Sequence, residues 1–157
     1  MEVELSLPKR LGERPRTNPT VPHQQESENA PPQLQEALFE RASALPGVQT
    51  GRSLVSVPGA RAFLLDPSYA NGPKQAFMAG NEFAHLHPSY DGSLHISLPE
   101  ALAREVIAAG WGEFHPMVEM GVMPPTALMV YGPRNAAELE TVWKIVEASY
   151  RFACGSS

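Results

Sequence analysis

The stretch GNEFAHLHPSYDGSLHISLP, residues Gly80–Pro99, predicts a β-hairpin that carries three histidines. Apolar residues alternate with other residues over 83–87 and again over 93–97, and this period of two is typical of half-buried strands. The intervening segment, Pro88–Gly92, has the composition of a turn, and its glycine can adopt a positive φ. The pattern therefore predicts two antiparallel strands joined by a short loop.

The same alternation predicts the register of the hairpin. If His87 pairs with Ser93, the leucine and isoleucine side chains share one face, and a shift by one residue would mix them with the histidines. His85 and His95 then oppose each other, with Cβ atoms about 4.5–5.5 Å apart. In a regular strand Glu82 lies on the face opposite to His85. The predicted cross-strand pairs are His87 with Ser93, His85 with His95, and Phe83 with Ser97.

Three histidines on one sheet face are candidate metal ligands. Histidine is the commonest metal ligand, and its unperturbed pKa lies near neutral pH. Three histidines with an open position form some catalytic zinc sites, so His85, His87 and His95 could bind a divalent transition metal. No other cofactor is indicated. Two alternatives stay open, namely acid–base catalysis by the histidines without metal and a cluster that only stabilises the fold or contacts a ligand.

Further polar residues could complete a catalytic site. His115 and Glu113, in the segment GWGEFHP, are candidate proton-transfer groups. Arg134 is the candidate substrate anchor, because its planar fork fits a carboxylate or a phosphate. The alternative for Arg134 is an ion pair with a neighbouring glutamate such as Glu138.

Two residues are candidate contacts to a bound ligand or cofactor. Trp111 lies between glycines and could be exposed enough to stack on a ligand, or it could pack its loop onto the core. Asp91, in the hairpin loop, could complete or orient the histidine site.

The remaining elements predict an α+β fold, in which a mostly antiparallel sheet has helices packed on one face in two layers. Residues 1–31 are rich in proline and polar residues, which predicts a disordered tail, and His23 within it has no assigned role. Residues 32–157 then form a single domain. Its first predicted elements are a helix over 32–45, strands over 53–57 and 60–65, and a further strand or edge segment over 74–78. After the hairpin, we expect a helix from a Ser97/Glu100 capping box to 110, a loop over 111–125, a strand over 126–131 and a helix from an Asn135/Glu138 cap to about 153.

Composition limits the range of partners. The chain of 157 residues has a net charge of −5 and no large Lys/Arg cluster, so nucleic acid is not an expected partner. No apolar run is long enough to cross a bilayer, and no signal peptide is evident, which predicts a cytoplasmic protein without membrane contact. A small-molecule ligand is the expected partner, and the oligomeric state stays open.

Three blocks of the sequence resemble a known family. EFAHLHPSYDGSLHISLP, GWGEFHP and VYGPRNAAELETVWKIVEASYRFACG, within 76–155, resemble small bacterial and fungal proteins that carry a luciferase domain. The resemblance implies light-emitting oxidation of a small organic substrate, and it carries over no established catalytic residue. The sequence itself contains no glycine-rich flavin or nicotinamide signature. If the chain is an enzyme, we expect a metal- or histidine-dependent oxidoreductase or hydrolase; the alternative is a non-catalytic module that binds a small molecule or a protein and in which the histidines are structural.

Overall fold

The computed structural model describes residues 4–156. Within these residues, six strands form one sheet in the order β1-β2-β3-β4-β6-β5, and every neighbouring pair is antiparallel. The strands are β1 (Val48–Arg52), β2 (Arg61–Leu65), β3 (Glu82–Leu86), β4 (Leu94–Ser97), β5 (Gly112–Phe114) and β6 (Ala127–Val130).

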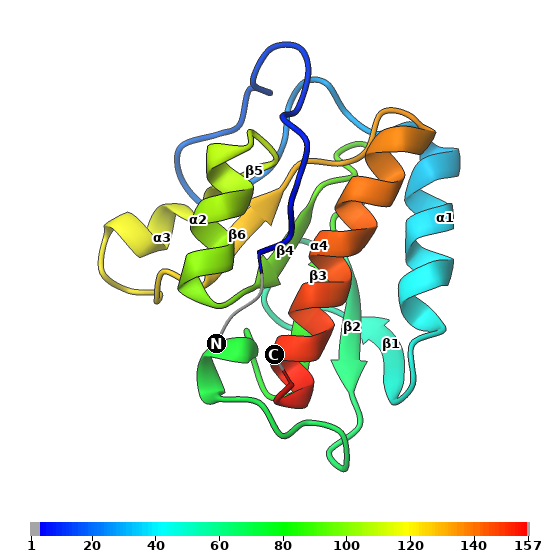
Figure 1. The fold of residues 1–157 in the computed structure, drawn as a ribbon, viewed down its shortest axis with the longest axis vertical. Helices are drawn as coiled ribbons and strands as arrows, with labels where there is room; N and C mark the ends of the chain where they lie inside the picture. Colours follow the sequence, from blue (N-terminus) through cyan, green and yellow to red (C-terminus); the bar gives the residue numbers. More distant parts are fainter. Residues whose placement is uncertain (1–3, 157) are drawn as a thin grey trace.

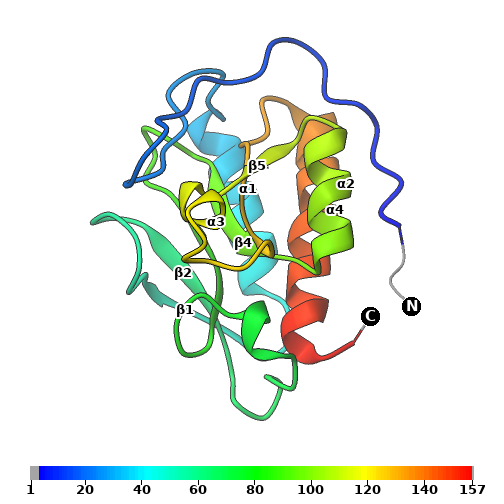
Figure 2. The same ribbon diagram turned by 90° about the vertical axis from the view of Figure 1, so that its left-hand side faces the viewer.

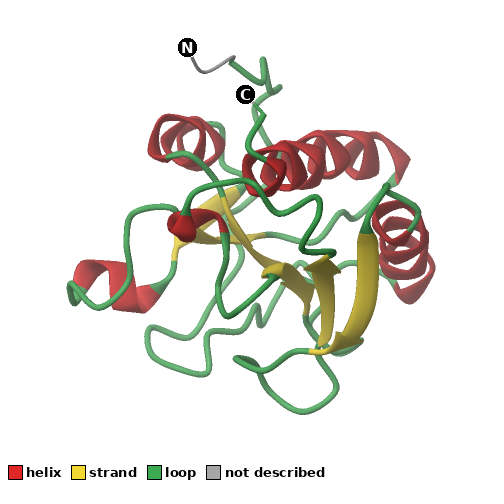
Figure 3. Cartoon of the chain, turned by 90° about the horizontal axis from the view of Figure 1, so that it is seen from below, coloured by secondary structure: helices red, strands yellow, loops and turns green. Residues whose placement is uncertain are grey.

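Three helices cover one face of the sheet, as Figures 1 and 3 show. They are α1 (Pro32–Ser43), α2 (Glu100–Ala108) and α4 (Ala136–Cys154). A single-turn helix, α3 (Pro116–Glu119), and a 3-10 turn, η1 (Lys74–Ala76), lie in the connections. The α+β fold predicted from the sequence is confirmed.

The core lies between the sheet and these helices. The strands contribute the leucine and isoleucine side chains that the hairpin alternation assigned to one face, and α4 contributes valine and isoleucine from its inner face. This burial is the main stabilising contribution to the fold. The large core residues include Leu38, Phe63, Leu65, Phe83, Leu86, Leu94, Ile96, Leu98, Leu128, Val130, Val142, Ile145 and Val146.

Helix ends confirm one predicted cap and correct another. Asn135 caps α4, because its side chain accepts a hydrogen bond from the backbone N–H of Glu138. Gly155 ends α4 in the left-handed region, with φ of 87°. The predicted capping box at Ser97 is wrong: Pro99 is the N-cap of α2, and no side chain caps that helix.

Three other segments differ from the prediction. The strand predicted over 53–57 lies earlier, at β1, whose residues are mostly exposed and therefore lack an apolar alternation. The segment 74–78 begins with a 3-10 turn and not with a strand. The predicted loop over 111–125 contains β5 and α3, both too short to produce a periodic pattern.

The N-terminal segment, residues 4–31, crosses the molecule. In Figure 2 it starts beside the helices, passes over the end of the sheet and reaches the face that the helices leave uncovered. Along this path, the backbone N–H of Arg10 donates to Ala109 O over 2.8 Å, and Trp111 Nε1 donates to Pro8 O over 2.6 Å. His23 and Gln25 are buried. The composition predicted a tail without fixed contacts, whereas this segment packs on the domain; residues 1–3 of the predicted tail lie outside the described residues.

Within residues 4–156, no helix combines the length and the apolar character that a membrane span requires.

Candidate functional site

The hairpin has the predicted register around its histidines. His85 pairs with His95 across β3 and β4, and the backbone N–H of His87 donates to Ser93 O over 2.9 Å. The three imidazoles lie on the face away from the main helices, and all three residues are buried. The apolar alternation therefore placed these side chains correctly.

A β-bulge changes the start of β3. Phe63 pairs with Ala84, but the next residue of β2, Leu64, pairs with Glu82. Phe83 is thus the extra residue of β3, and the alternation of faces is interrupted there.

The bulge overturns two predictions. Phe83 does not oppose Ser97 on the histidine face but packs in the core, with its ring centroid 6.1 Å from that of Tyr150. Glu82 does not point away from His85: its Oε2 lies 2.8 Å from His85 Nδ1. A carboxylate that a regular strand would direct to the other face thus contacts the histidine cluster.

Three ring nitrogens of the hairpin converge on one point. His95 Nδ1 lies 3.2 Å from His85 Nε2 and 3.0 Å from His87 Nε2. The centroids of the three rings are between 4.5 and 5.2 Å apart. The candidate ligand atoms of the three residues all lie within 4.8 Å of one another.

The outward-facing nitrogens of two of these rings contact acidic groups. His85 Nδ1 contacts Glu82, as described above. His87 Nδ1 lies 2.8 Å from Ser93 Oγ, and that hydroxyl donates to Asp91 Oδ1 over 2.5 Å. Asp91 is fully buried in the hairpin loop and orients His87 through Ser93. The structure thus places Asp91 beside the histidines as a supporting group.

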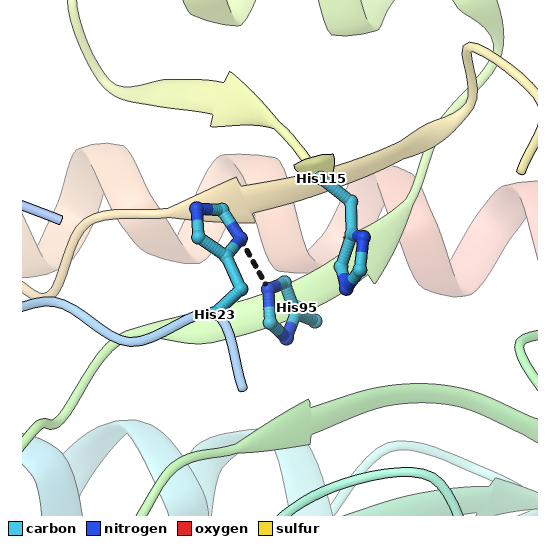
Figure 4. Close-up of side chains that lie close together, drawn as sticks. All are labelled: His23, His95 and His115. Carbon is cyan, nitrogen blue, oxygen red and sulfur yellow. Dashed lines mark hydrogen bonds between the residues drawn. The ribbon is translucent and has the colours of Figure 1, made fainter. Parts of the chain in front are cut away.

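The N-terminal segment supplies a fourth imidazole, His23, which contacts the third ring. His23 Nδ1 lies 2.9 Å from His95 Nε2, and Figure 4 shows the two rings joined in this way. The other nitrogen, His23 Nε2, lies 2.8 Å from Glu113 Oε2. Sequence reasoning missed this residue, because it is 72 positions from His95 in a segment without strand or helix periodicity.

Glu113 lies at the centre of a hydrogen-bonded group behind His23. Tyr131 Oη donates to its Oε1 over 2.8 Å, and Thr17 Oγ1 donates to its Oε2 over 2.8 Å. Arg14 forms an ion pair with it over 2.9 Å. Burial alone would raise the pKa of Glu113, but the hydrogen bonds from His23, Tyr131 and Thr17 lower it to about 2. Glu113 is therefore a fixed negative charge and a poor proton acceptor.

Two of the hairpin rings, His85 and His95, favour the neutral form. Burial lowers the pKa of His85 and opposes the raising effect of Glu82. Burial, and then the neighbouring rings of His87 and His85, lower the pKa of His95 well below its usual value. A buried imidazolium is costly without a charge partner, so the neutral forms are favoured.

On neutral rings, the contacts of the cluster fix every proton except that of His95. Ionised carboxylates only accept, so His85 must donate from Nδ1 to Glu82, and His23 must donate from Nε2 to Glu113. Because the Ser93 hydroxyl donates to Asp91, His87 must donate from Nδ1 to Ser93 Oγ. His23 Nδ1 is then an acceptor that faces His95 Nε2. When His95 carries its proton on this Nε2, the three nitrogens that converge, those of His85, His87 and His95, all lack a proton.

His115 differs from the other rings. Its Nδ1 accepts a hydrogen bond from the backbone N–H of Met117 over 3.1 Å, so the neutral ring carries its proton on Nε2. Burial, followed by the nearby ring of His23, lowers the pKa of His115 to about 4. Its ring centroid lies 5.0 Å from that of His95 (Figure 4).

His23, His95 and His115 form a second group whose candidate ligand atoms lie within 4.8 Å of one another. Two of its three members, His95 and His115, carry a proton on Nε2 in the arrangement above. This second group is therefore a hydrogen-bonded contact and less suited to a metal ion than the hairpin group.

A cavity of about 320 Å³ adjoins the histidines. Its walls are mostly apolar, and the histidine rings supply the polar groups, which is the usual composition of a small-molecule site. Val21 and Val55 are at least half exposed and lie at its walls. The lining residues are Val21, Pro22, His23, Val55, Ser56, Val57, Met78, His85, His87, His95, His115, Met123, Ala127 and Leu128.

Two predicted site residues lie elsewhere, and neither is among the described residues that line this cavity. Arg134 pairs with Glu138 over 2.6 Å and with Glu28 over 3.0 Å, so the alternative ion pair is observed. Trp111 is 3% exposed and belongs to the core. The structure thus brings together the hairpin histidines, Asp91 and His115. Glu113 is connected to this group through His23.

The comparisons with known proteins that gave matches all point to luciferases. Residues 80–149 match the family model described as Luciferase domain. The chain is 34% identical to the luciferases of Armillaria mellea and Armillaria ostoyae over 160 residues, which cover 91% of this chain and 59% of each relative. It is 44% identical to the luciferase of Neonothopanus nambi over 70 residues, which cover 43% of this chain and 26% of that protein. The chain thus matches about three fifths of the length of the Armillaria relatives, and no solved structure matches it significantly.

Proposed function

Since residues 80–149 of this chain belong to the luciferase-domain family, we propose that it binds a divalent transition metal and assists the oxidation of a small organic molecule. The metal ligands are His85, His87 and His95, and the substrate occupies the adjoining cavity. Hydrolysis at the same centre is the alternative reaction.

The convergence of three unprotonated nitrogens carries this proposal. With the His95 proton on Nε2, lone pairs face one another at 3.0 and 3.2 Å, and they repel unless a cation lies between them. Ligand nitrogens of a tetrahedral zinc centre, with Zn–N bonds of about 2.0–2.1 Å, are about 3.3–3.4 Å apart. The two observed separations are 0.1–0.4 Å shorter than this, so a small outward movement of the rings would open a three-histidine centre, and the cavity beside it leaves a position for substrate.

The surroundings of the three rings support the same conclusion. Histidines that bind metals usually donate their other N–H to a carboxylate, a carbonyl or water, which fixes the ring and increases its basicity. His85 has Glu82 in this position, and His87 has Ser93 backed by Asp91. The groups behind His85 and His87 therefore orient these two rings with their bare nitrogens inward.

When bound, a metal at this centre would supply Lewis-acid or redox chemistry next to the substrate. The protein contributes a second polar group, His115, whose Nε2–H can donate to a substrate oxygen. A neutral imidazole that donates a hydrogen bond can polarise a carbonyl or stabilise a developing oxyanion. Apolar wall residues, among them Val57, Met78 and Leu128, surround this contact.

The family membership favours oxidation over hydrolysis. The relatives are named luciferases, and the name denotes light emission by oxidation of a substrate. A concave cavity argues for a small molecule, since a protein-binding module would present a flat apolar patch at the histidines.

Elemental analysis tests the metal centre. We expect protein purified without chelator to contain about one equivalent of zinc, iron, manganese or copper, and the His85→Ala/His95→Ala variant to contain none. The matched control is His115→Ala, which removes a neighbouring imidazole outside the ligand set and keeps the metal. If the wild-type protein binds none of these ions after incubation with each, the metal centre is wrong and the site is a ligand-binding or acid–base site.

A further inference from the structure

The contacts of His95 point to a role for two residues outside the proposed set of metal ligands, one of which, His23, also lines the cavity. We infer that His23 and Glu113 are positioning residues, which fix His95 in the tautomer whose unprotonated Nδ1 faces His85 and His87. The geometry stands on its own, whereas the purpose of this tautomer, to complete a ligand set, rests on the proposed function.

The proton of His95 can lie on either ring nitrogen, whereas the protons of His85 and His87 are held on Nδ1. The Nδ1 atoms of His85 and His87 face acidic groups that hold a proton there. Both nitrogens of His95 instead contact imidazoles, so neither side offers a carboxylate directly. If the proton of His95 moved to Nδ1, it could be donated to either hairpin partner, and the centre would lose one of its three lone pairs.

His23 favours one of the two positions. Its side chain is fully buried, and its Nε2 is committed to Glu113, so its Nδ1 can only accept. A proton on His95 Nε2 makes the 2.9 Å contact with His23 a hydrogen bond, whereas a proton on Nδ1 would leave two bare nitrogens facing each other there. The negative charge of Glu113 thus acts on His95 through His23, and it strengthens the donor power of the inward Nδ1 as a directly bound carboxylate does.

The N-terminal segment is anchored to the same carboxylate. Besides His23, this segment contributes Thr17 and Arg14, both hydrogen-bonded to Glu113. These residues precede the part of the chain that matches the family model, residues 80–149. The segment is therefore a functional part of the centre.

The tautomer can be measured without metal. Long-range ¹H–¹⁵N correlation spectra of the chelator-treated protein distinguish protonated from bare ring nitrogens. We expect His95 in the wild-type protein to be protonated on Nε2 only, and in His23→Leu to show a mixture of both tautomers. Glu113→Gln should shift the population in the same direction by a smaller amount, because an amide can accept from or donate to His23. The control is His115→Leu, which removes a ring that lies as close to His95 as His23 does but has no hydrogen bond to it. We expect this variant to leave the tautomer of His95 unchanged.

A rescue variant and a measurement of zinc affinity complete the test. His23→Gln retains an acceptor for His95 and a donor for Glu113, so it should restore the wild-type tautomer. Competition with a chromophoric chelator should show zinc binding about 10–100-fold weaker in His23→Leu than in the wild type. A wild-type His95 with its proton on Nδ1, or a His23→Leu variant that folds with an unchanged tautomer, overturns the inference. A tautomer that shifts as expected in a protein that binds no metal supports the inference and contradicts the proposed function.

Discussion

Arg10 is a charged residue in a buried position. Its side chain is 6% exposed, yet Nε and Nη2 have no hydrogen-bond partner among residues 4–156. Burial, and then the positive charge of Arg134, lower the pKa of Arg10. Desolvated donors without partners each cost about 1–3 kcal/mol, and an apolar replacement of similar shape is often neutral or stabilising.

We therefore expect Arg10→Met to unfold in urea with a free energy equal to that of the wild type or higher. Arg16→Met, at an exposed position of the same segment, should change the free energy of unfolding by less than about 0.5 kcal/mol. A loss of more than about 2 kcal/mol in Arg10→Met would show that the guanidinium has partners that stabilise the fold.

His115 connects the site to the pH dependence of stability. Its pKa is about 4 in the folded protein against 6.5 for the free side chain. As the pH falls through 6.5, the unfolded chain binds a proton that the folded chain does not, so the free energy of unfolding decreases until about pH 4.

In metal-free protein, His115→Gln should lose less stability than the wild type between pH 6.5 and 4, whatever its stability at pH 7. Urea titrations at several pH values in this window give the slope of the free energy of unfolding against pH for both proteins. Parallel slopes would mean that the His115 imidazole is protonated as easily in the folded state as in the unfolded state.

At the scale of the element, the bulge in β3 decides which carboxylate reaches the centre. Glu82 is fully buried and accepts from Ser53 Oγ over 2.8 Å and from the backbone N–H of Leu54 over 3.2 Å. These donors hold the carboxylate of Glu82 beside His85. In a regular strand, without the bulge at Phe83, Glu82 would face the helices and would lack these partners.

Glu82→Gln tests this contribution with little change of shape. An amide can still accept from His85, but the negative charge is lost, so we expect zinc affinity to fall about 10–100-fold. Glu140→Gln, at an exposed position of α4, is the matched control and should bind zinc as the wild type does. Equal affinities of the two variants would remove Glu82 from the metal centre.

The hairpin shows which features of a strand can be predicted from the sequence pattern and which cannot. The alternation around His85 and His95 predicted their pairing, because each face has a uniform polarity there. Phe83 could not be placed in the same way, because an apolar residue satisfies the alternation whether or not a bulge is present. β1 was displaced in the prediction, because an exposed edge strand has no apolar face to mark it.

At the scale of the whole molecule, Gln25 fastens the N-terminal segment to the domain. Its backbone N–H donates to Asp91 Oδ2, and its side-chain Oε1 accepts from the backbone N–H of Gly132, each over 3.1 Å. His23 could not be assigned from the sequence for the same reason: its partners, His95 and Glu113, come from distant parts of the chain, and composition alone predicted a tail.

Gln25→Ala leaves the buried N–H of Gly132 without its partner, so we expect a loss of about 1–3 kcal/mol in the free energy of unfolding. Hydrogen exchange should also accelerate at Glu26, whose N–H bonds to Arg16 O within the segment. Gln24→Ala, which removes only a partly exposed contact to Tyr90, is the control with small effects on both. Unchanged exchange in Gln25→Ala would mean that other contacts hold the segment.

The path of the N-terminal segment also sets an order of assembly. During synthesis, His23 leaves the ribosome before His95 and Glu113, which follow it by 72 and 90 positions. The strand that carries His95 needs β6, so the sheet is complete only after residue 130 has been made. His23 is therefore synthesised before its partners but docks only after they have folded, and an ion could reach the three hairpin histidines before the fourth imidazole covers them.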